Sequence, residues 1–325
     1  MKSFIEKRYA KPNERYPLSR LYMLQVFAWS LGIFWLCSFP ALAQVVVSGQ
    51  VGGVDVADLD VTSGNPRNLV TSPEVILPEL VQADVVYLGE NHDNPEDHKT
   101  QLEIIQKLKQ RNPKIAIAME MFQRPYQGVL DRYLAGQVSE QELLEQSEYN
   151  QRWGFPWGYY APILRFAKEK HLPVIALNTP TEVTRKVARE GLESLTPEQR
   201  QFIPPISEIR TDNAEYRQLM VEAFRQHQSA AHGSSADESR FFLAQVLWDE
   251  TMAEAIAKFL KAKPDYQVVV LAGQGHIVYG YGIPSRVARR LNGKQLVQRS
   301  VLLSPSKDAP AKKDKPIADF VWQQQ

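Results

Sequence analysis

The sequence predicts an α/β fold: a mainly parallel β-sheet flanked by helices, with a helical insertion or lid between the third and fourth strands. The first observation behind this prediction is a set of short, continuous apolar runs, which are typical of strands buried on both faces. Five such runs occur, at residues 84–90, 114–121, 172–178, 266–276 and 295–303. The second observation is that helical patterns separate the runs. Strands joined through helices form right-handed crossovers, so the sheet is expected to be parallel.

The helices are predicted from their periodicity and their caps. In the first, residues 94–111, Asn94 can cap the helix and Pro95 suits the first helical position. The other helices are expected at residues 124–135, 139–147, 157–171, 180–190, 212–228, 238–262 and 284–291. The stretch 180–262 is longer than one crossover requires, and it is therefore assigned to the helical insertion.

Residues 1–43 have the pattern of a secretory signal peptide. Residues 1–20 carry six basic and two acidic side chains, residues 21–43 carry no charge, and the run ends in "ALA". Because an uncharged run of this length could also span a bilayer, an uncleaved N-terminal membrane anchor is the alternative. Pro40 and the small-residue ending favour cleavage. In both cases the protein is expected to be exported, either periplasmic or associated with the membrane through residues 21–43.

The α/β domain itself is assigned to residues 81–303. Residues 44–80 are rich in Val, Gly, Ser, Asp and Pro without a sustained period, and we expect an extended lead-in there. Residues 304–325 begin with a Pro- and Lys-rich stretch, and we expect a flexible tail.

Charge and cysteine content exclude several classes of protein. The net charge is +1, and because the first 20 residues are basic, the remainder of the chain is mildly acidic. A nucleic-acid partner is therefore not expected. Cys37 is the single cysteine, so neither a disulfide framework nor a thiolate metal site is expected. Trp35 and Leu36 stand where a lipoprotein signal has small residues, so lipidation of Cys37 is not expected either.

Polar side chains follow several strands at the point where each strand ends. Glu90 and His92 end the first, Glu120 ends the second, and His276, with Tyr279 three residues later, follows the fourth. In an open parallel sheet, ligands bind outside the carboxyl ends of the strands. Each of these residues alone could simply be solvated or structural, but together they predict one site, whose members should have perturbed pKa values.

An aromatic segment, "RWGFPWGYYAPIL" at residues 152–164, is the second unusual stretch. It could be a plug that fastens a loop to the core, or an aromatic wall for a flat ligand. Asp249 could orient a site histidine. His98 could lean toward the site or into solvent, whereas His171 precedes a strand and belongs to the opposite edge of the sheet.

Five segments, taken in order, resemble the ChaN-like haem-binding uptake family, which belongs to a superfamily with the Tiki/TraB and erythromycin-esterase-like proteins. The resemblance covers about residues 80–290. The segments are "YLGENHDNPEDHKTQLEII", "AMEMFQRPYQGVLDRYL", "WGFPWGYYAPILRFAKEKHLPVIALN", "LWDETMAEAIAKFL" and "VVVLAGQGHIVYGYGIPSRV".

The resemblance implies an α/β fold with a helical insertion and haem or iron binding outside the cytoplasm. In part of the family a homodimer is thought to hold haems face to face, which makes a homodimer one possibility here. The family's motifs fall on three short stretches of this sequence, Gly89-Glu90-x-His92, Glu120 and Gly273-x-Gly275-His276. The matching Glu and His residues are catalytic in the esterase-like relatives, and comparable positions are proposed to hold a divalent metal in the Tiki-like relatives.

Two hypotheses follow, and the residues leave both open. In the first, the chain binds haem non-covalently, with an axial ligand from His92, His276 or Tyr279 and an aromatic wall that includes Trp153 and Trp157. Lys99 or Arg124 could meet the propionates.

In the second hypothesis the chain is a hydrolase that uses Glu90, His92, Glu120 and His276. Glu90 or His92 would act as the general base and His276 as the proton donor. Alternatively, His92, Glu120 and His276 would bind a divalent metal ion. A serine hydrolase is disfavoured, since the sequence contains no G-x-S-x-G motif. A structural protein with a relict site is a third, minor alternative.

Overall fold

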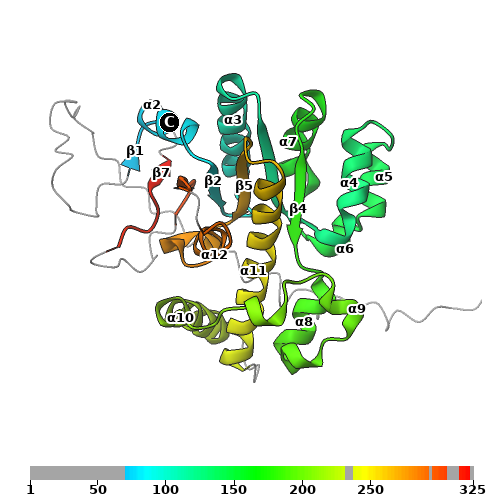
Figure 1. The fold of residues 1–325 in the computed structure, drawn as a ribbon, viewed down its shortest axis with the longest axis vertical. Helices are drawn as coiled ribbons and strands as arrows, with labels where there is room; N and C mark the ends of the chain where they lie inside the picture. Colours follow the sequence, from blue (N-terminus) through cyan, green and yellow to red (C-terminus); the bar gives the residue numbers. More distant parts are fainter. Residues whose placement is uncertain (1–69, 231–236, 293–294, 306–314, 323–325) are drawn as a thin grey trace, which may run out of the picture. The chain divides into compact units, whose positions relative to one another are not determined.

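One parallel β-sheet forms the centre of the computed structural model, which describes residues 70–230, 237–292, 295–305 and 315–322 (Figure 1). Within these residues the sheet has seven strands in the order β1-β7-β6-β2-β5-β3-β4, and every neighbouring pair is parallel. The strands are β1 (Val70–Thr71), β2 (Val85–Glu90), β3 (Ile115–Gln123), β4 (Val174–Asn178), β5 (Gln267–Gly273), β6 (Gln298–Leu302) and β7 (Phe320–Trp322). The predicted parallel α/β fold is therefore confirmed.

Helices connect the strands at the positions that periodicity indicated. Asn94 caps α3 by accepting a hydrogen bond from the backbone N–H of Glu96, and Pro95 occupies the first turn, as predicted. The helices are α2 (Pro73–Val81), α3 (Pro95–Arg111), α4 (Gln127–Leu134), α5 (Glu140–Gln146), α6 (Tyr149–Arg152), α7 (Trp157–Glu169), α8 (Thr181–Glu190), α9 (Pro197–Arg200), α10 (Ala214–Ala230), α11 (Glu238–Ala262) and α12 (Ile283–Arg290). None of these described helices is long and apolar enough to cross a membrane.

The main core lies between the sheet and the helices α11 and α12. Tyr87 of β2 and Val270 of β5 pack there against Met252 and Ile256 of α11. Successive side chains of a strand point to opposite faces of a sheet. Glu90, three residues after Tyr87, therefore points to the other face, where α3 packs against α7.

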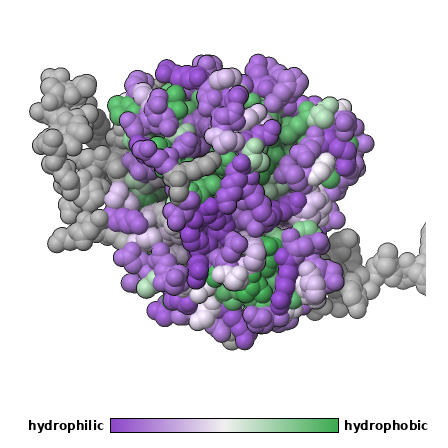
Figure 2. Space-filling model, viewed as in Figure 1, coloured by the Kyte–Doolittle hydropathy of each residue, from purple (hydrophilic) through white to green (hydrophobic). Residues whose placement is uncertain are grey.

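The stretch between β4 and β5 is helical, as predicted for the insertion. Its last helix, α11, completes the main core, whereas α8 packs on α11 through a smaller apolar cluster around Val187 and Leu247. Figure 2 shows an apolar area low on this face, where α8 and α11 meet, and the half-buried Leu192 and Leu243 pack there.

Two terminal segments differ from the sequence prediction. The lead-in expected over residues 44–80 ends in helix α2, because Pro73 starts a helix whose Ile76 and Leu80 lie on one buried face. The tail expected over residues 304–325 contains β7, a short apolar strand that pairs with β6 and β1. The signal peptide or anchor predicted over residues 1–43 lies outside the described residues.

The strand order explains how distant residues come to share one site. β5 lies between β2 and β3, so the carboxyl ends of the three strands are neighbours. Glu90 stands opposite Gly273 in the ladder. In β3 the register with β4 shifts between Met119 and Gln123, and such a bulge re-aims side chains. Glu120 lies within that irregular stretch.

Candidate functional site

The carboxylate of Glu120 lies between the two imidazoles that the sequence assigned to the site. Its Oε1 is 3.5 Å from Nε2 of His276, and its Oε2 is 4.0 Å from Nε2 of His92. Oε2 also accepts a hydrogen bond of 2.8 Å from the backbone N–H of Gly273, at the end of β5. Glu120 is 5% exposed, and the two histidines are 2% exposed or less. The predicted convergence at this edge of the sheet is thus present in the structure.

A second carboxylate, Glu90, orients His92. Nδ1 of His92 is 2.6 Å from Oε1 of Glu90, so its N–H donates to that oxygen and Nε2 turns toward Glu120. Two more donors hold Glu90: the hydroxyl of Tyr160 in α7, at 2.7 Å, and the side-chain amide of Gln101 in α3, at 2.6 Å. His98 leans inward, with Nδ1 3.6 Å from Oε2. Glu90 is fully buried, and three side chains donate to its carboxylate.

A third carboxylate, Asp249 of α11, orients His276 in the same manner. Nδ1 of His276 is 2.7 Å from Oδ1 of Asp249. The hydroxyl of Tyr216, in α10, donates to Oδ2, and the side-chain amide of Gln245, one turn before Asp249, lies 3.1 Å from Nδ1. The role proposed for Asp249 from the sequence agrees with this geometry. His276 follows β5 in a single 3₁₀ turn, η6 (Gln274–His276).

The result is one buried chain of acids and imidazoles that crosses the end of the sheet. It runs from Glu90 through His92, Glu120 and His276 to Asp249, alternating carboxylate with imidazole. The Glu90 half lies on the α3 and α7 side and the Asp249 half on the α11 side, with Glu120 at the junction. Hydrogen bonds in a buried site are electrostatically stronger than in water, so Glu90 and Asp249 fix the orientation of the two imidazoles.

Within the acid–imidazole chain, the imidazoles offset the effect of burial on the carboxylates. Burial alone would raise the pKa of Glu120, but the positive charge and hydrogen bond of His276, together with His92, lower that pKa to about 2. Burial would likewise raise the pKa of Glu90, and His92, His98 and Tyr160 together bring it below its usual value. Both carboxylates therefore stay ionised at neutral pH.

Asp97, in the first turn of α3, behaves in the opposite way. It accepts hydrogen bonds from the backbone N–H of Asn91, at 2.8 Å, and from the hydroxyl of Ser304, at 2.6 Å. Burial nevertheless raises the pKa of Asp97 to about 6. This residue fastens the loop after β2 to the chain that follows β6.

Aromatic residues cover the His92 side of the site. The ring of His92 contacts Trp153 edge-on at 4.9 Å and Phe155 at 5.0 Å between centroids, and His98 stacks on Tyr159. Trp157, which the sequence also assigned to a ligand wall, packs instead on Phe122 and Tyr149. In the aromatic segment 152–164, Trp157 therefore fastens the segment through Phe122 and Tyr149, whereas Trp153 covers the imidazole of His92.

Tyr279 lies on the other side of His276, in the 3₁₀ turn η7 (Val278–Gly280). It is 3% exposed, and its ring lies 5.6 Å from that of Tyr281. Its backbone has a φ of 56°, a left-handed conformation that is unusual for a residue other than glycine. Strain of this kind is concentrated at functional sites.

Gly282 permits the close approach of α12 to the site. A Cβ there would collide with the backbone carbonyl of His276 and would lie 3.1 Å from Oδ1 of Asp249. Gly275, in the predicted G-x-GH motif, has open space where a Cβ would stand. The glycine required by the packing around His276 is thus Gly282, outside the motif.

Several site residues were not found from the sequence. Gln101, Tyr160, Tyr216 and Gln245 all hold a carboxylate or imidazole of the chain. A polar side chain among the buried positions of a helix could have indicated a site residue. Gln101, three residues after His98 on α3, is such a side chain.

The exposed His171 lies at the opposite edge of the sheet, before β4, as predicted. The side chain of His227 and the whole of His232 lie outside the described residues.

The divalent-metal site predicted at His92, Glu120 and His276 finds no support. Among the residues that the structure describes, no three His, Cys, Asp or Glu side chains are arranged to hold a metal ion. The two imidazoles do have the orientation that metal ligands have, with Nδ1 on a carboxylate.

A family model matches most of the described chain. The family model described as "Haem-binding uptake, Tiki superfamily, ChaN" matches residues 76–287. A solved structure, described as cofacial heme binding to ChaN of Campylobacter jejuni, is similar to this chain with a TM-score of 0.58. It is 20% identical, and the similarity covers 77% of this chain and 91% of that one. At this identity the similarity shows a shared fold.

Two further proteins show similarity to this chain. The Arabidopsis thaliana protein RETICULATA-RELATED 5, chloroplastic, is 28% identical over 274 residues, which are 80% of this chain but only 36% of the plant protein. A mutant of the erythromycin esterase EreC in its open conformation has a TM-score of 0.42 and 14% identity, over 71% of this chain and 72% of that one. A similarity this weak says nothing about activity.

The low pKa of Glu120 predicts a contribution to stability that depends on pH. The unfolded chain binds a proton at Glu120 near pH 4.5, whereas the folded chain does so only near pH 2. Stability from Glu120 is therefore fully present above the unfolded pKa and is lost as pH falls from about 4.5 to about 2. We expect Glu120→Gln to be less stable than the wild type at pH 7, by a margin that shrinks in this window. Urea denaturation at several pH values measures it, with the exposed Glu103→Gln as control; a constant margin would contradict the prediction.

A matched pair of glycine variants tests the packing around His276. Gly282→Ala should lower the free energy of unfolding by about 1–3 kcal/mol, because the new Cβ meets backbone that cannot withdraw. Gly275→Ala should change it little, since nothing lies within 4 Å of its Cβ position. Chemical denaturation gives both values, and equal losses in the two variants would show that Gly282 is not the special position.

Proposed function

We propose that this chain, which belongs to the ChaN family of haem-binding uptake proteins in the Tiki superfamily, binds haem non-covalently. Its proposed role is the uptake or handling of haem or iron. The family model covers the strands β2 to β5 and the site residues at their ends, and this match carries the proposal. Haem is then the cargo of the protein. The ChaN protein of similar fold is described as binding heme cofacially.

The donor chemistry of the site supports haem as a ligand. Haem iron takes axial ligands from His and Tyr, and His92, His276 and Tyr279 all lie near this edge of the sheet. Trp153 contributes an aromatic surface next to His92. Both cations suggested for the propionates are ion-paired, Lys99 with Glu96 at 2.6 Å and Arg124 with Glu254 at 2.8 Å, but the side chain of Lys99 is 70% exposed and that of Arg124 only 18%. Lys99 is thus the better placed of the two.

Burial sets a condition on this proposal. Each of the three axial candidates is at most 3% exposed, so a macrocycle reaches any of them only after the neighbouring chain moves. The imidazoles are also committed to carboxylates. Tyr279 is therefore the candidate whose ligation would leave the buried acid–imidazole chain intact.

Compartment and assembly belong to the same proposal. The charge-free stretch with an "ALA" ending supports export to the periplasm or the membrane surface. The plant relative is named as chloroplastic. A homodimer would suit cofacial haems, and we include it in the proposal.

Hemin titration tests haem binding directly. The purified chain should give a saturable Soret band, and Tyr279→Phe should shift or weaken that band because the phenolate is the proposed axial ligand. Tyr281→Phe, one aromatic ring away, is the matched control and should keep the wild-type spectrum. A titration that resembles free hemin with an unrelated protein would end the haem proposal; a band changed only by His276→Ala would move the ligand to that imidazole.

A second candidate function, Glu- and His-based hydrolysis, is favoured by the alternation of acids and imidazoles. In this function Glu90 and Asp249 orient the imidazoles through Nδ1, and Glu120 stabilises positive charge on both. This is the role of the acid in a catalytic triad. Because three donors already engage the carboxylate of Glu90, His92 is the better general base. His276 would be the proton donor.

Hydrolysis of p-nitrophenyl acetate tests this second function. His276→Gln should lower kcat by about 100-fold or more, since a positioned acid or base contributes about that much. Asp249→Asn should also alter the pH profile, because the carboxylate orients the imidazole through Nδ1. The exposed His171→Gln is the control. Turnover no faster than with a control protein, or turnover unchanged in His276→Gln, would count against an esterase site here.

A further inference from the structure

We propose that the chain has a second ligand site, separate from the acid–imidazole chain, which binds a small amphipathic monocarboxylate. The site is a cavity of about 320 Å³ between α12, the strand β6 and residues 315–319. It lies on the α12 face of the sheet, near the edge formed by β6 and β7. None of Glu90, His92, Glu120 and His276 lines it.

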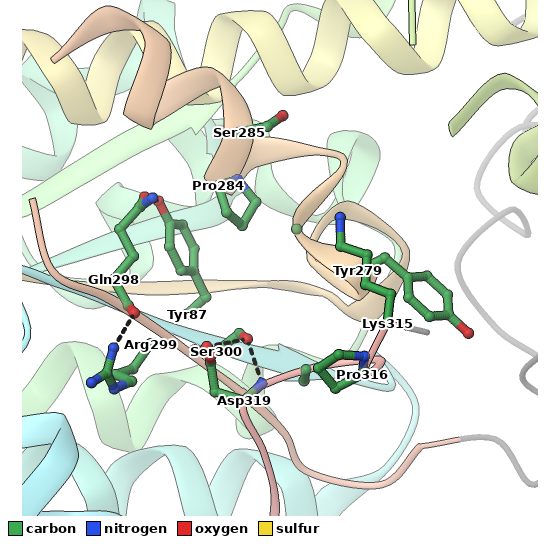
Figure 3. Close-up of a pocket in the computed structure, with 12 residues that line it drawn as sticks. Tyr87, Tyr279, Pro284, Ser285, Gln298, Arg299, Ser300, Lys315, Pro316 and Asp319 are labelled. Atoms are coloured by element: carbon green, nitrogen blue, oxygen red, sulfur yellow. Dashed lines mark hydrogen bonds between the residues drawn. The ribbon is translucent and has the colours of Figure 1, made fainter. Parts of the chain in front are cut away.

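Figure 3 shows how the cavity is built. Tyr87 and Gln298 lie together on one side, and Lys315 lies on the opposite side, with Pro284 of α12 above the space between them. Ser300 and Asp319 close the site below. The polar groups thus stand at opposite ends of a space with partly apolar walls.

The charges of the lining favour an anion with a single negative charge. Arg299 is paired with Glu79 at 3.0 Å. Lys315 is held over the ring of Tyr281, with Nζ 4.2 Å from the centroid, and pairs with no carboxylate within the part of the chain that the structure describes. A cation–π contact leaves the ammonium hydrogens free to bind a ligand carboxylate.

The acidic residue in the lining limits the ligand further. The carboxylate of Asp319 accepts hydrogen bonds of 2.7 Å from both the backbone N–H and the hydroxyl of Ser300, and it remains a negative charge at the rim. One ammonium that pairs with no described carboxylate, together with one carboxylate elsewhere in the lining, suits a monoanion. A phosphate dianion would need more cations than this lining offers.

The far end of the cavity offers a hydrogen-bond donor and an apolar surface. The hydroxyl of Tyr87 donates to Oε1 of Gln298 at 2.6 Å, which fixes the amide and leaves its NH₂ group as a donor. Tyr87 is fully buried, and it is the one tyrosine in an otherwise aliphatic strand interior. Its ring, with Pro284 and Pro316, supplies the apolar wall. The ligand is therefore a carboxylate with a short apolar body, for which this volume is sufficient.

Benzoate is the probe for the test, with benzamide as its uncharged counterpart. Isothermal titration of the full, haem-free chain should show saturable 1:1 binding of benzoate. Lys315→Met should weaken that binding about tenfold or more, which corresponds to the loss of one charge-assisted contact. Lys315 is exposed, so its replacement leaves the fold intact. Lys168→Met is the matched control, because Lys168 also lies over a tyrosine ring, that of Tyr133, far along the chain from this cavity.

Three results would overturn the proposal: no saturable binding of benzoate or of the aliphatic probe hexanoate, equal affinity in Lys315→Met and wild type, or benzamide binding as tightly as benzoate. Displacement of benzoate by equimolar inorganic phosphate would also contradict it, because the site would then select phosphate. Tyr279 lines this cavity and is also the proposed haem ligand. For this reason none of the variants in the benzoate test changes Tyr279.

Discussion

The buried carboxylate of Glu120 is the group around which the site is built. An ionised carboxylate removed from water requires opposite charge and hydrogen bonds around it. Here the two imidazoles and the backbone N–H of Gly273 supply them. The bulge in β3, the position of β5 beside it and the close approach of α12 at Gly282 all serve this one arrangement. Loss of any one of them would weaken the compensation of this buried charge.

The two proposed functions use the same property of the imidazoles in different ways. A histidine whose Nδ1 is fixed by a carboxylate presents Nε2 in a defined direction, and that suits both metal ligation and proton transfer. In the structure both Nε2 atoms face Glu120. Proton exchange can occur within such an interior, whereas a macrocycle needs an opening. Tyr279, outside the alternation of acids and imidazoles, is where haem could bind without disturbing it.

Much of this architecture could be predicted from the sequence, because buried parallel strands and capped helices leave local signals. The run that ends in Glu90 and the cap at Asn94 were of this kind. Local signals do not encode contacts between distant segments. Tyr160 and Tyr216 reach the site only through the packing of α7 and α10, and the register shift that aims Glu120 depends on β4. The apolar β7 was missed because its pairing partners lie far away in the sequence.

The place of β5 in the sheet also governs the order in which the protein can form. β2, β3 and β4 precede it in the chain, yet β5 must enter between β2 and β3. During synthesis, β5 can pair with these two strands only after more than one hundred further residues have followed β3. Such long-range pairing is slow and leaves strand edges exposed in the nascent chain. The same delay means that Glu90 and Glu120 meet His276 only when most of the chain has been made.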